Sequence, residues 1–474
     1  MRAVIGYEEK DPEITQHLTS GYPRFVQHPF LKQASAHVLK VTQMAGHELW
    51  LTSSIRAAEA LVGWLTGTDA QVLQHERLTG VAFRENAETY SRAKTFLQNT
   101  GTFLSSREAE DYLLRVGELD APQPEVTFEG YPAARVKGAV ARAFQHVTPE
   151  NVFLANGGMN AVYAAFRVAS TLQRRRGRTV WIQLGWLYLD TIAILQKYTD
   201  QPTRDCVLLT NVFDLPALQA LFSERGHEIA GIITEVPTNP LLQTADLPAV
   251  YELCRSHEAI LIVDPSVVSP LNVDVLPYSD VAVSSLTKYA ACEGDVLMGT
   301  VVVNPDGLFA RDFANLLPGE LEPVYSRDLS RLAVEIAEYE SVVAEINRSV
   351  PKVVEFLQTH PRISSLYWPT QPTSRDNYLK LARSPEAVGC MISFTVSGSL
   401  AEFYDRLRLP KGPSFGIKTT LICPFIYLAH YDLVTSESGR AILHASGLDP
   451  ELLRLSVGCE PVEDIIEALR EALG

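Results

Sequence analysis

Clustered cysteines are absent from this 474-residue chain. None of its six cysteines sits in a Cys-x-x-Cys pair, and they are widely spaced. The spacing excludes a disulfide framework and a zinc site of the usual kind, so we expect free thiols and no bound metal. The cysteines are Cys206, Cys254, Cys292, Cys390, Cys423 and Cys459.

The chain also lacks basic excess and long apolar runs. It has 41 Lys and Arg against 56 Asp and Glu, a formal net charge of −15, which argues against nucleic acid and anionic membranes as partners. The sequence has no apolar run of about 18 residues, so no membrane span is predicted. Residues 1–12 are charged and lack the apolar core of a signal peptide. The composition, 46% hydrophobic and 20% charged, is that of a globular protein, and we expect a cytoplasmic enzyme.

Three regions differ in their pattern. Residues 1–123 show helical patterns and no regular strand alternation, and are expected to form an N-terminal extension or interface segment. In residues 124–330, apolar runs rich in β-branched residues alternate with helical stretches such as Leu215–Phe222 and Ala249–Ser256. This alternation predicts an α/β domain with a buried, mostly parallel sheet between helices. The expected strands are Thr179–Leu184, Cys206–Thr210, Ile229–Val236, Ala259–Asp264, Val281–Ser284 and Met298–Val303.

Residues 331–474 are predicted to form a linking helix and a smaller α+β domain. Apolar residues from Leu332 to Ile346 make one helical stripe, and Pro351 is expected to kink or end that helix. The later elements expected are strands at Cys390–Val396 and Leu453–Val457 and helices at Leu400–Leu407 and Pro461–Leu473.

Two reactive side chains follow predicted strands. Lys288, in Ser284-Ser285-Leu286-Thr287-Lys288-Tyr289, comes just after an apolar strand, where burial lowers the pKa of an amine and makes it nucleophilic. Asp264 ends another strand at the edge where α/β sheets bind ligands. Each has an ordinary alternative: an exposed lysine in a turn, and an aspartate that caps a helix.

Two loops complete the pattern. Asn156-Gly157-Gly158-Met159 leads into a helix, where backbone N–H groups and the helix dipole favour a phosphate, although a simple turn also explains it. Glu235-Val236-Pro237-Thr238-Asn239-Pro240 places an amide on a stiff loop that has an equally good structural explanation. Taken together, the four sites put an anion cradle, an amide, a carboxylate and a lysine at successive strand ends. A lysine that forms a Schiff base, with an aspartate for a ring nitrogen, is the signature of pyridoxal phosphate.

With these residues, the chain resembles the cystathionine γ-synthase-like family, the Cys/Met-metabolism branch of fold-type I pyridoxal-phosphate enzymes. The similarity runs from about residue 151 to the C-terminus. It is carried by Asn156–Ala161, Tyr188–Thr191, Glu235–Pro240 with Asp246-Leu247, Asp264, Ser285–Tyr289 and Leu453–Gly458.

The resemblance implies a role for each matching residue. Lys288 binds the cofactor covalently and moves protons, Asp264 pairs with the ring nitrogen, and Tyr188 stacks on the ring. The phosphate is held by Gly157, Gly158, Met159, Ser285 and Thr287. Asn239 and Glu235 lie near the ring hydroxyl, while Arg454 and Ser414 contact substrate, Arg454 through the α-carboxylate.

The N-terminal part is similar to a fungal-type cystathionine γ-synthase subgroup, through Ile5–Glu9, Gly21–Phe25, Ala93–Phe96 and Ser105–Arg107. The family's Tyr-x-Arg segment, which reaches a neighbouring subunit's phosphate, has no clear copy, and Arg107 is its suggested substitute. The chain departs from the family at Tyr188-Leu189-Asp190-Thr191 (usually Tyr-Gly-Gly-Thr), Asp264-Pro265, Cys292-Glu293 and Ser414–Thr420. The last two changes, which include Lys418, concern the substrate side.

The function implied is γ-replacement on an activated homoserine, such as an O-acyl homoserine, by a thiol or another nucleophile. A γ- or β-lyase that releases a 2-oxo acid and ammonia is the alternative, and a non-catalytic relative is a minor one. The resemblance also implies small amino-acid substrates and a homodimer or homotetramer.

Overall fold

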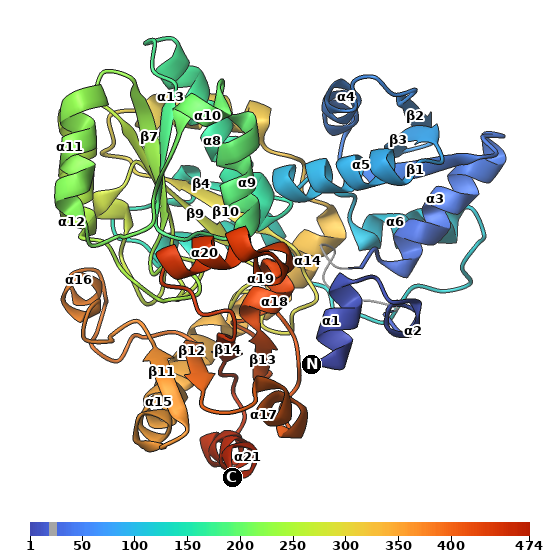
Figure 1. Cartoon of the computed structure of the whole chain (residues 1–474). Coiled ribbons are helices and arrows are strands. Elements are labelled where there is room, and N and C mark those ends of the chain that lie inside the picture. Colours follow the sequence, from blue (N-terminus) through green and yellow to red (C-terminus); the bar gives the residue numbers. More distant parts are fainter. Residues whose placement is uncertain (19–25) are drawn as a thin grey trace.

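The computed structural model describes residues 1–18 and 26–474. The similarity at Gly21–Phe25 lies outside these residues. Figure 1 shows an N-terminal unit in blue beside a large sheet, with a C-terminal unit in orange and red below it. The three sheets lie within residues 47–84, 152–303 and 363–456, and the domain boundaries near residues 124 and 331 stay a prediction. Among the described residues, no helix combines the length and apolar composition needed to cross a bilayer.

The large sheet has seven strands in the order β4-β10-β9-β8-β7-β5-β6. Four neighbouring pairs are parallel, and β10 alone runs against its two neighbours, which confirms the predicted, mostly parallel sheet. Six strands match the expected apolar runs, whereas the short edge strand β4 was not predicted. The bounds are β4 (Val152–Ala155), β5 (Val180–Leu184), β6 (Cys206–Leu209), β7 (Ile229–Glu235), β8 (Ile260–Asp264), β9 (Val281–Ser285) and β10 (Gly299–Val303).

The large sheet is buried on both faces because its side chains alternate between two cores. On β8, Ile260 and Ile262 pack into one core, and Leu261 and Val263 pack into the other. The helices of this region are α7 (Pro132–Arg142), α8 (Gly158–Arg174), α9 (Leu189–Tyr198), α10 (Pro202–Asp205), α11 (Leu215–Arg225), α12 (Leu247–Ser256) and α13 (Ala310–Glu320).

The N-terminal unit contains a three-stranded antiparallel sheet, so the expectation of no regular strands there was wrong. Its middle strand is buried on both faces, with Ala82 in one core and Val81 and Phe83 in another. Two-sided burial removes the polar alternation by which a strand is recognised. The strands are β1 (His47–Thr52), β2 (Gln71–His75) and β3 (Leu78–Arg84); the helices are α1 (Arg2–Glu8), α2 (Pro12–Thr15), α3 (Pro29–Val41), α4 (Ile55–Trp64), α5 (Ala87–Thr100) and α6 (Ser106–Arg115).

The linking helix breaks earlier than expected. α14 (Ser326–Glu335) and α15 (Tyr339–Thr359) are separated by a 3₁₀ turn at Ile336–Glu338. Pro351 does not end α15, so that part of the prediction was wrong. Pro351 lies on the exposed side of the helix, while its neighbours Val350 and Val353 are buried. We infer that this packing offsets the loss of one backbone hydrogen bond.

The C-terminal unit is a four-stranded antiparallel sheet in the order β11-β12-β14-β13. The two predicted strands are its central pair, and the two edge strands were not predicted. The strands are β11 (Ile363–Tyr367), β12 (Met391–Val396), β13 (Leu421–Pro424) and β14 (Leu453–Ser456); the helices are α16 (Arg375–Leu379), α17 (Leu400–Arg406), α18 (Phe425–Ala429), α19 (Tyr431–Thr435), α20 (Glu437–Ala445) and α21 (Val462–Leu473).

Candidate functional site

A pocket opens at the carboxyl edge of the parallel strands, between the large sheet and the C-terminal unit. It brings together most of the side chains predicted from the sequence. Those lining it are Gly158, Met159, Tyr188, Glu235, Asn239, Asp264, Ser285, Lys288, Ser414 and Arg454. Gly157, Thr287 and Arg107 are not among the lining residues.

Lys288 is half-buried in the loop after β9. Its Nζ donates a hydrogen bond to Ser414 Oγ at 2.9 Å and lies 4.8 Å from the centre of the Phe415 ring. Burial, together with the positive charge of Arg454, lowers the pKa of Lys288 to about 7. A large fraction of this amine is therefore neutral near pH 7 and able to act as nucleophile or base.

Two carboxylates lie side by side at the same sheet edge, because Glu235 ends β7 and Asp264 pairs with it at the end of β8. Asp264 Oδ1 accepts a hydrogen bond from the Ser266 N–H at 2.8 Å, and burial raises the pKa of Asp264 to about 6. Glu235 Oε1 accepts the Tyr188 N–H at 2.5 Å. Burial and the nearby charge of Asp264 raise the pKa of Glu235 well above its usual value.

The first turn of α8 forms a close-fitting cradle against β9. A Cβ atom on Gly158 would lie 2.8 Å from Ser285 Cβ, so only glycine lets the backbone approach so closely. Gly157 precedes the helix and has open space around it. Thr287 Oγ1 accepts the Met298 N–H at 3.2 Å, a bond that holds the loop carrying Lys288.

Arg454 projects from β14 and is only 5% exposed. It donates hydrogen bonds to Asn239 Oδ1 at 3.2 Å and to the Pro413 carbonyl. Its guanidinium lies 5.4 Å from the Phe415 ring centre and 4.6 Å from the Phe425 ring centre. The two rings and the Asn239 amide hold the guanidinium fork in place in the pocket lining.

Arg107 lies away from this pocket within its own chain. Its guanidinium bonds Glu125 Oε2 at 2.7 Å and Asp328 Oδ1 at 3.0 Å, and it also pairs with Asp295. Its contact with a neighbouring subunit's phosphate stays a prediction.

Sequence reasoning missed the apolar wall on the C-terminal side of the pocket. Phe415 was visible only as a departure from the family's Ser-Leu-Gly-Gly, and the rest gave no signal because apolar residues in a predicted core are not distinctive. The lining residues not predicted are Val162, Thr191, Ser266, Val267, Pro413, Phe415, Cys423, Phe425, Leu428 and Ala429.

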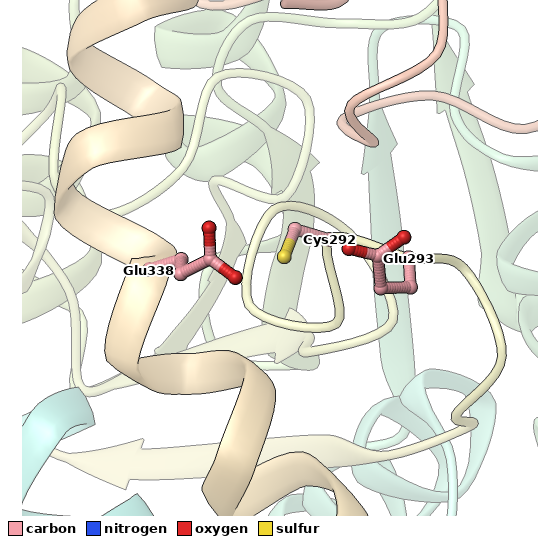
Figure 2. A group of neighbouring side chains, drawn as sticks. All are labelled: Cys292, Glu293 and Glu338. Carbon is pink, nitrogen blue, oxygen red and sulfur yellow. The ribbon is translucent and has the colours of Figure 1, made fainter. Parts of the chain in front are cut away.

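A second cluster, formed by Cys292, Glu293 and Glu338, lies outside the pocket lining (Figure 2). Its ligand-type atoms lie within 4.8 Å of one another. However, Lys418 Nζ donates to Glu293 Oε1 at 2.6 Å and to Glu338 Oε1 at 3.0 Å. Burial raises the pKa of Cys292 to about 12, so its thiol stays protonated. The cluster is a lysine-bridged ion pair, and neither Lys418 nor Glu293 lines the pocket.

Comparison with known proteins decides the family. The model of the family described as "Cys/Met metabolism PLP-dependent enzyme" matches residues 142–474. The chain belongs to this family. It is therefore an enzyme, and its cofactor is pyridoxal 5′-phosphate.

Similar proteins differ in their reactions. An L-2-amino-4-chloropent-4-enoate dechlorinase/desaturase of Streptantibioticus cattleyicolor is 38% identical over 472 residues, which span 100% of this chain and 94% of that protein. A cystathionine γ-synthase of Neurospora crassa is 30% identical over 70% of this chain and 53% of its own length. The crystal structure of cystathionine γ-lyase CalE6 from Micromonospora echinospora aligns with a TM-score of 0.60 at 22% identity, over 75% of this chain and 90% of its own. The last supports the fold.

The residues of the pocket fit the cofactor. The close approach of Gly158 to Ser285 brings the N-terminus of α8 and the Ser285 hydroxyl together in the pocket lining, and helix N–H groups beside a hydroxyl suit a phosphate. Asp264 is a half-buried carboxylate whose Oδ1 accepts the Ser266 N–H, and it suits a protonated ring nitrogen. When bound, the cofactor withdraws electrons from the substrate's α-carbon.

Proposed function

We propose that this enzyme removes a leaving group from Cγ of an L-α-amino acid that has a short, uncharged side chain. The observation that carries the proposal is the division of the pocket. Its ionisable groups bind either the cofactor or the α-carboxylate of the substrate. Beside them, an apolar wall is formed by Phe415, Phe425 and Leu428.

Each charged group then has one task. Arg454 binds the substrate α-carboxylate through its fork, and Ser414 holds the Lys288 amine within reach of Cα. Lys288 removes the Cα proton and acts next at Cβ. The overall elimination is balanced: one proton leaves Cβ, the Cγ–X bond breaks with its electron pair going to X⁻, the Cα proton is restored, and the carbon chain gains one π bond. The net product is HX and an unsaturated amino acid.

Elimination is favoured over replacement by cysteine for a chemical reason. A second amino acid needs partners for its own carboxylate and ammonium groups. Among the lining residues of the described chain, Arg454 is the only guanidinium, and no carboxylate remains beyond Glu235 and Asp264. The full-length similarity to the dechlorinase/desaturase supports the same reaction class.

γ-Replacement on an O-acyl homoserine by a smaller thiol is the second candidate, supported by the similarity to cystathionine γ-synthases. It shares every step up to loss of the leaving group. A homodimer or homotetramer remains part of the proposal, and light scattering of the purified enzyme tests it.

The test is product analysis by mass spectrometry with purified holoenzyme. The substrates are L-2-amino-4-chloropent-4-enoate, O-acetyl-L-homoserine and O-succinyl-L-homoserine, each with and without cysteine or hydrosulfide. We expect loss of HX from the first substrate at a rate that thiol does not change. Efficient formation of cystathionine from O-succinyl-L-homoserine and cysteine would contradict the proposal.

A further inference from the structure

The C-terminal end of α5, in the N-terminal unit, contacts α8 and α9, two of the helices that carry pocket residues. In Figure 1, α5 points toward α8 and α9, and it packs against both. A Cβ atom on Gly101, directly after α5, would lie 2.3 Å from the Asn160 backbone nitrogen. Asn160 Nδ2 donates to the Thr100 carbonyl at 3.4 Å. This end of α5 therefore packs against the turn of α8 that forms the phosphate cradle.

One side chain of α5 reaches further, into α9. Asn99 Nδ2 donates a hydrogen bond to Asp190 Oδ1 at 2.8 Å, and Asn99 Oδ1 accepts one from Lys197 Nζ at 3.1 Å. Asn99 and Asp190 are only 2% and 4% exposed. One amide thus links a buried carboxylate and an ammonium group of the same helix, using both its donor and its acceptor.

Asp190 lies in the first turn of α9, directly before Thr191 and two residues after the N-cap Tyr188, both of which line the pocket. The Tyr188 N–H is bound to Glu235 Oε1 on the sheet side. The first turn of α9 is therefore held from two directions, by Glu235 within the large domain and by Asn99 from the N-terminal unit.

We propose that Asn99 is a positioning residue that sets the orientation of Tyr188 toward the cofactor ring by fixing Asp190. The N-terminal unit then has a part in building the cofactor site. The usual family residue at position 190 is glycine, which has no side chain to accept this bond, so the link depends on a residue at which this chain departs from the usual family sequence. The inference rests on the placement of Tyr188 beside the ring and does not depend on which substrate is used.

The test measures cofactor binding without turnover. The variants are Asn99→Leu, which has similar size and no hydrogen bonds, and the exchange Asn99→Asp with Asp190→Asn, which rebuilds the pair with its polarity reversed. Asn86→Ala is the matched control. Asn86 caps the other end of α5 by accepting the Thr89 N–H, so its loss weakens the same helix far from α9. The readouts are the Kd for pyridoxal phosphate, the visible circular dichroism of the bound cofactor and the Tm of the apoprotein.

We expect Asn99→Leu to raise the Kd about tenfold and to change the visible circular dichroism, since a hydrogen bond to a charged, buried group is lost. The exchanged pair should restore both signals. Asn86→Ala should lower the Tm and leave both unchanged. If Asn99→Leu lowers the Tm but leaves the Kd and the dichroism of the wild type, Asn99 is merely structural and the proposal is wrong.

If Asn99→Leu does not fold, the exchanged pair decides alone: wild-type Kd and dichroism support the proposal, and weakened binding in a folded protein contradicts it. Tyr188→Leu must itself change the visible dichroism. An unchanged spectrum would place Tyr188 away from the ring and overturn the inference, whatever reaction the enzyme catalyses.

Discussion

Lys288 and Ser414 lie 126 positions apart in the chain, and Lys288 Nζ donates a hydrogen bond to Ser414 Oγ at 2.9 Å. The lysine comes from the large sheet and the serine from the C-terminal unit, so this bond joins the two across the pocket. The serine hydroxyl carries no charge that would stabilise the ammonium form of Lys288. Burial and the positive charge of Arg454 therefore lower the pKa of Lys288 to about 7.

The first prediction concerns the pH at which the cofactor attaches. Attachment needs the neutral amine, so its rate should rise as the pH increases through about 7 and then level off. Arg454→Met removes a positive charge that lowers the pKa, so the midpoint should move to higher pH. Stopped-flow absorbance of apoenzyme mixed with pyridoxal phosphate measures it. Lys418→Met, outside the pocket, should keep the wild-type midpoint. An unchanged midpoint in Arg454→Met would contradict the prediction.

The second prediction concerns Asp264. Its folded-state pKa of about 6 exceeds the unfolded value. Above pH 6 the charged carboxylate therefore lowers the free energy of unfolding, and this effect disappears below about pH 4. Asp264→Asn should therefore stabilise the apoprotein by about 2 kcal/mol at pH 8 and by nearly nothing at pH 4. The same variant should bind pyridoxal phosphate more weakly. Urea unfolding at both pH values measures the first effect, and loss of stability at pH 8 would refute it.

The third prediction compares neighbouring glycines. Gly158→Ala places a Cβ 2.8 Å from Ser285 Cβ and should raise the Kd for pyridoxal phosphate at least tenfold. Gly157→Ala adds the same methyl group where nothing lies within 4 Å, at a φ of −170° that alanine adopts freely. Its Kd should stay within about threefold of the wild type. Equal losses in the two variants would show that the close contact is not what matters.

The fourth prediction concerns the aromatic wall. Phe415 lies beside both Lys288 and Arg454, and Phe415→Leu restores the usual family residue. Loss of a cation–π contact worth about 1 kcal/mol should raise KM for the amino acid about fivefold, with a smaller effect on kcat. Phe356→Leu is the control, because the Phe356 ring makes a similar contact outside the pocket: the guanidinium of Arg470, on the C-terminal helix, lies 5.3 Å from its centre. A change in kcat alone would argue against a role for Phe415 in holding Arg454.

The sequence predicts the large sheet well because its buried strands are continuous apolar runs. The order in which Asn239, Asp264 and Lys288 follow three of them was sufficient to place these residues at one edge. Strand β13 (Leu421–Pro424) lies at a sheet edge and has only four residues, so its sequence shows no clear period. β3 hides its period because both its faces are buried.

The substrate side was less predictable. Lys288 and Ser414 lie 126 positions apart in the sequence, and Asn99 and Asp190 lie 91 apart. No local sequence pattern predicts contacts between residues so far apart. The same applies to Lys418, which was expected on the substrate side: its two carboxylate partners come from separate segments of the chain.

We expect the cofactor to be attached to the amine of Lys288 in this pocket. Borohydride reduction of the holoenzyme followed by proteolysis and mass spectrometry tests it most directly, because reduction makes the bond permanent. We expect the pyridoxyl phosphate mass on the peptide that contains Lys288. In Lys288→Ala, we expect that mass to be absent from the corresponding peptide and the visible absorbance to be lost. The modification on another lysine, or unchanged yellow covalent protein in Lys288→Ala, would contradict it.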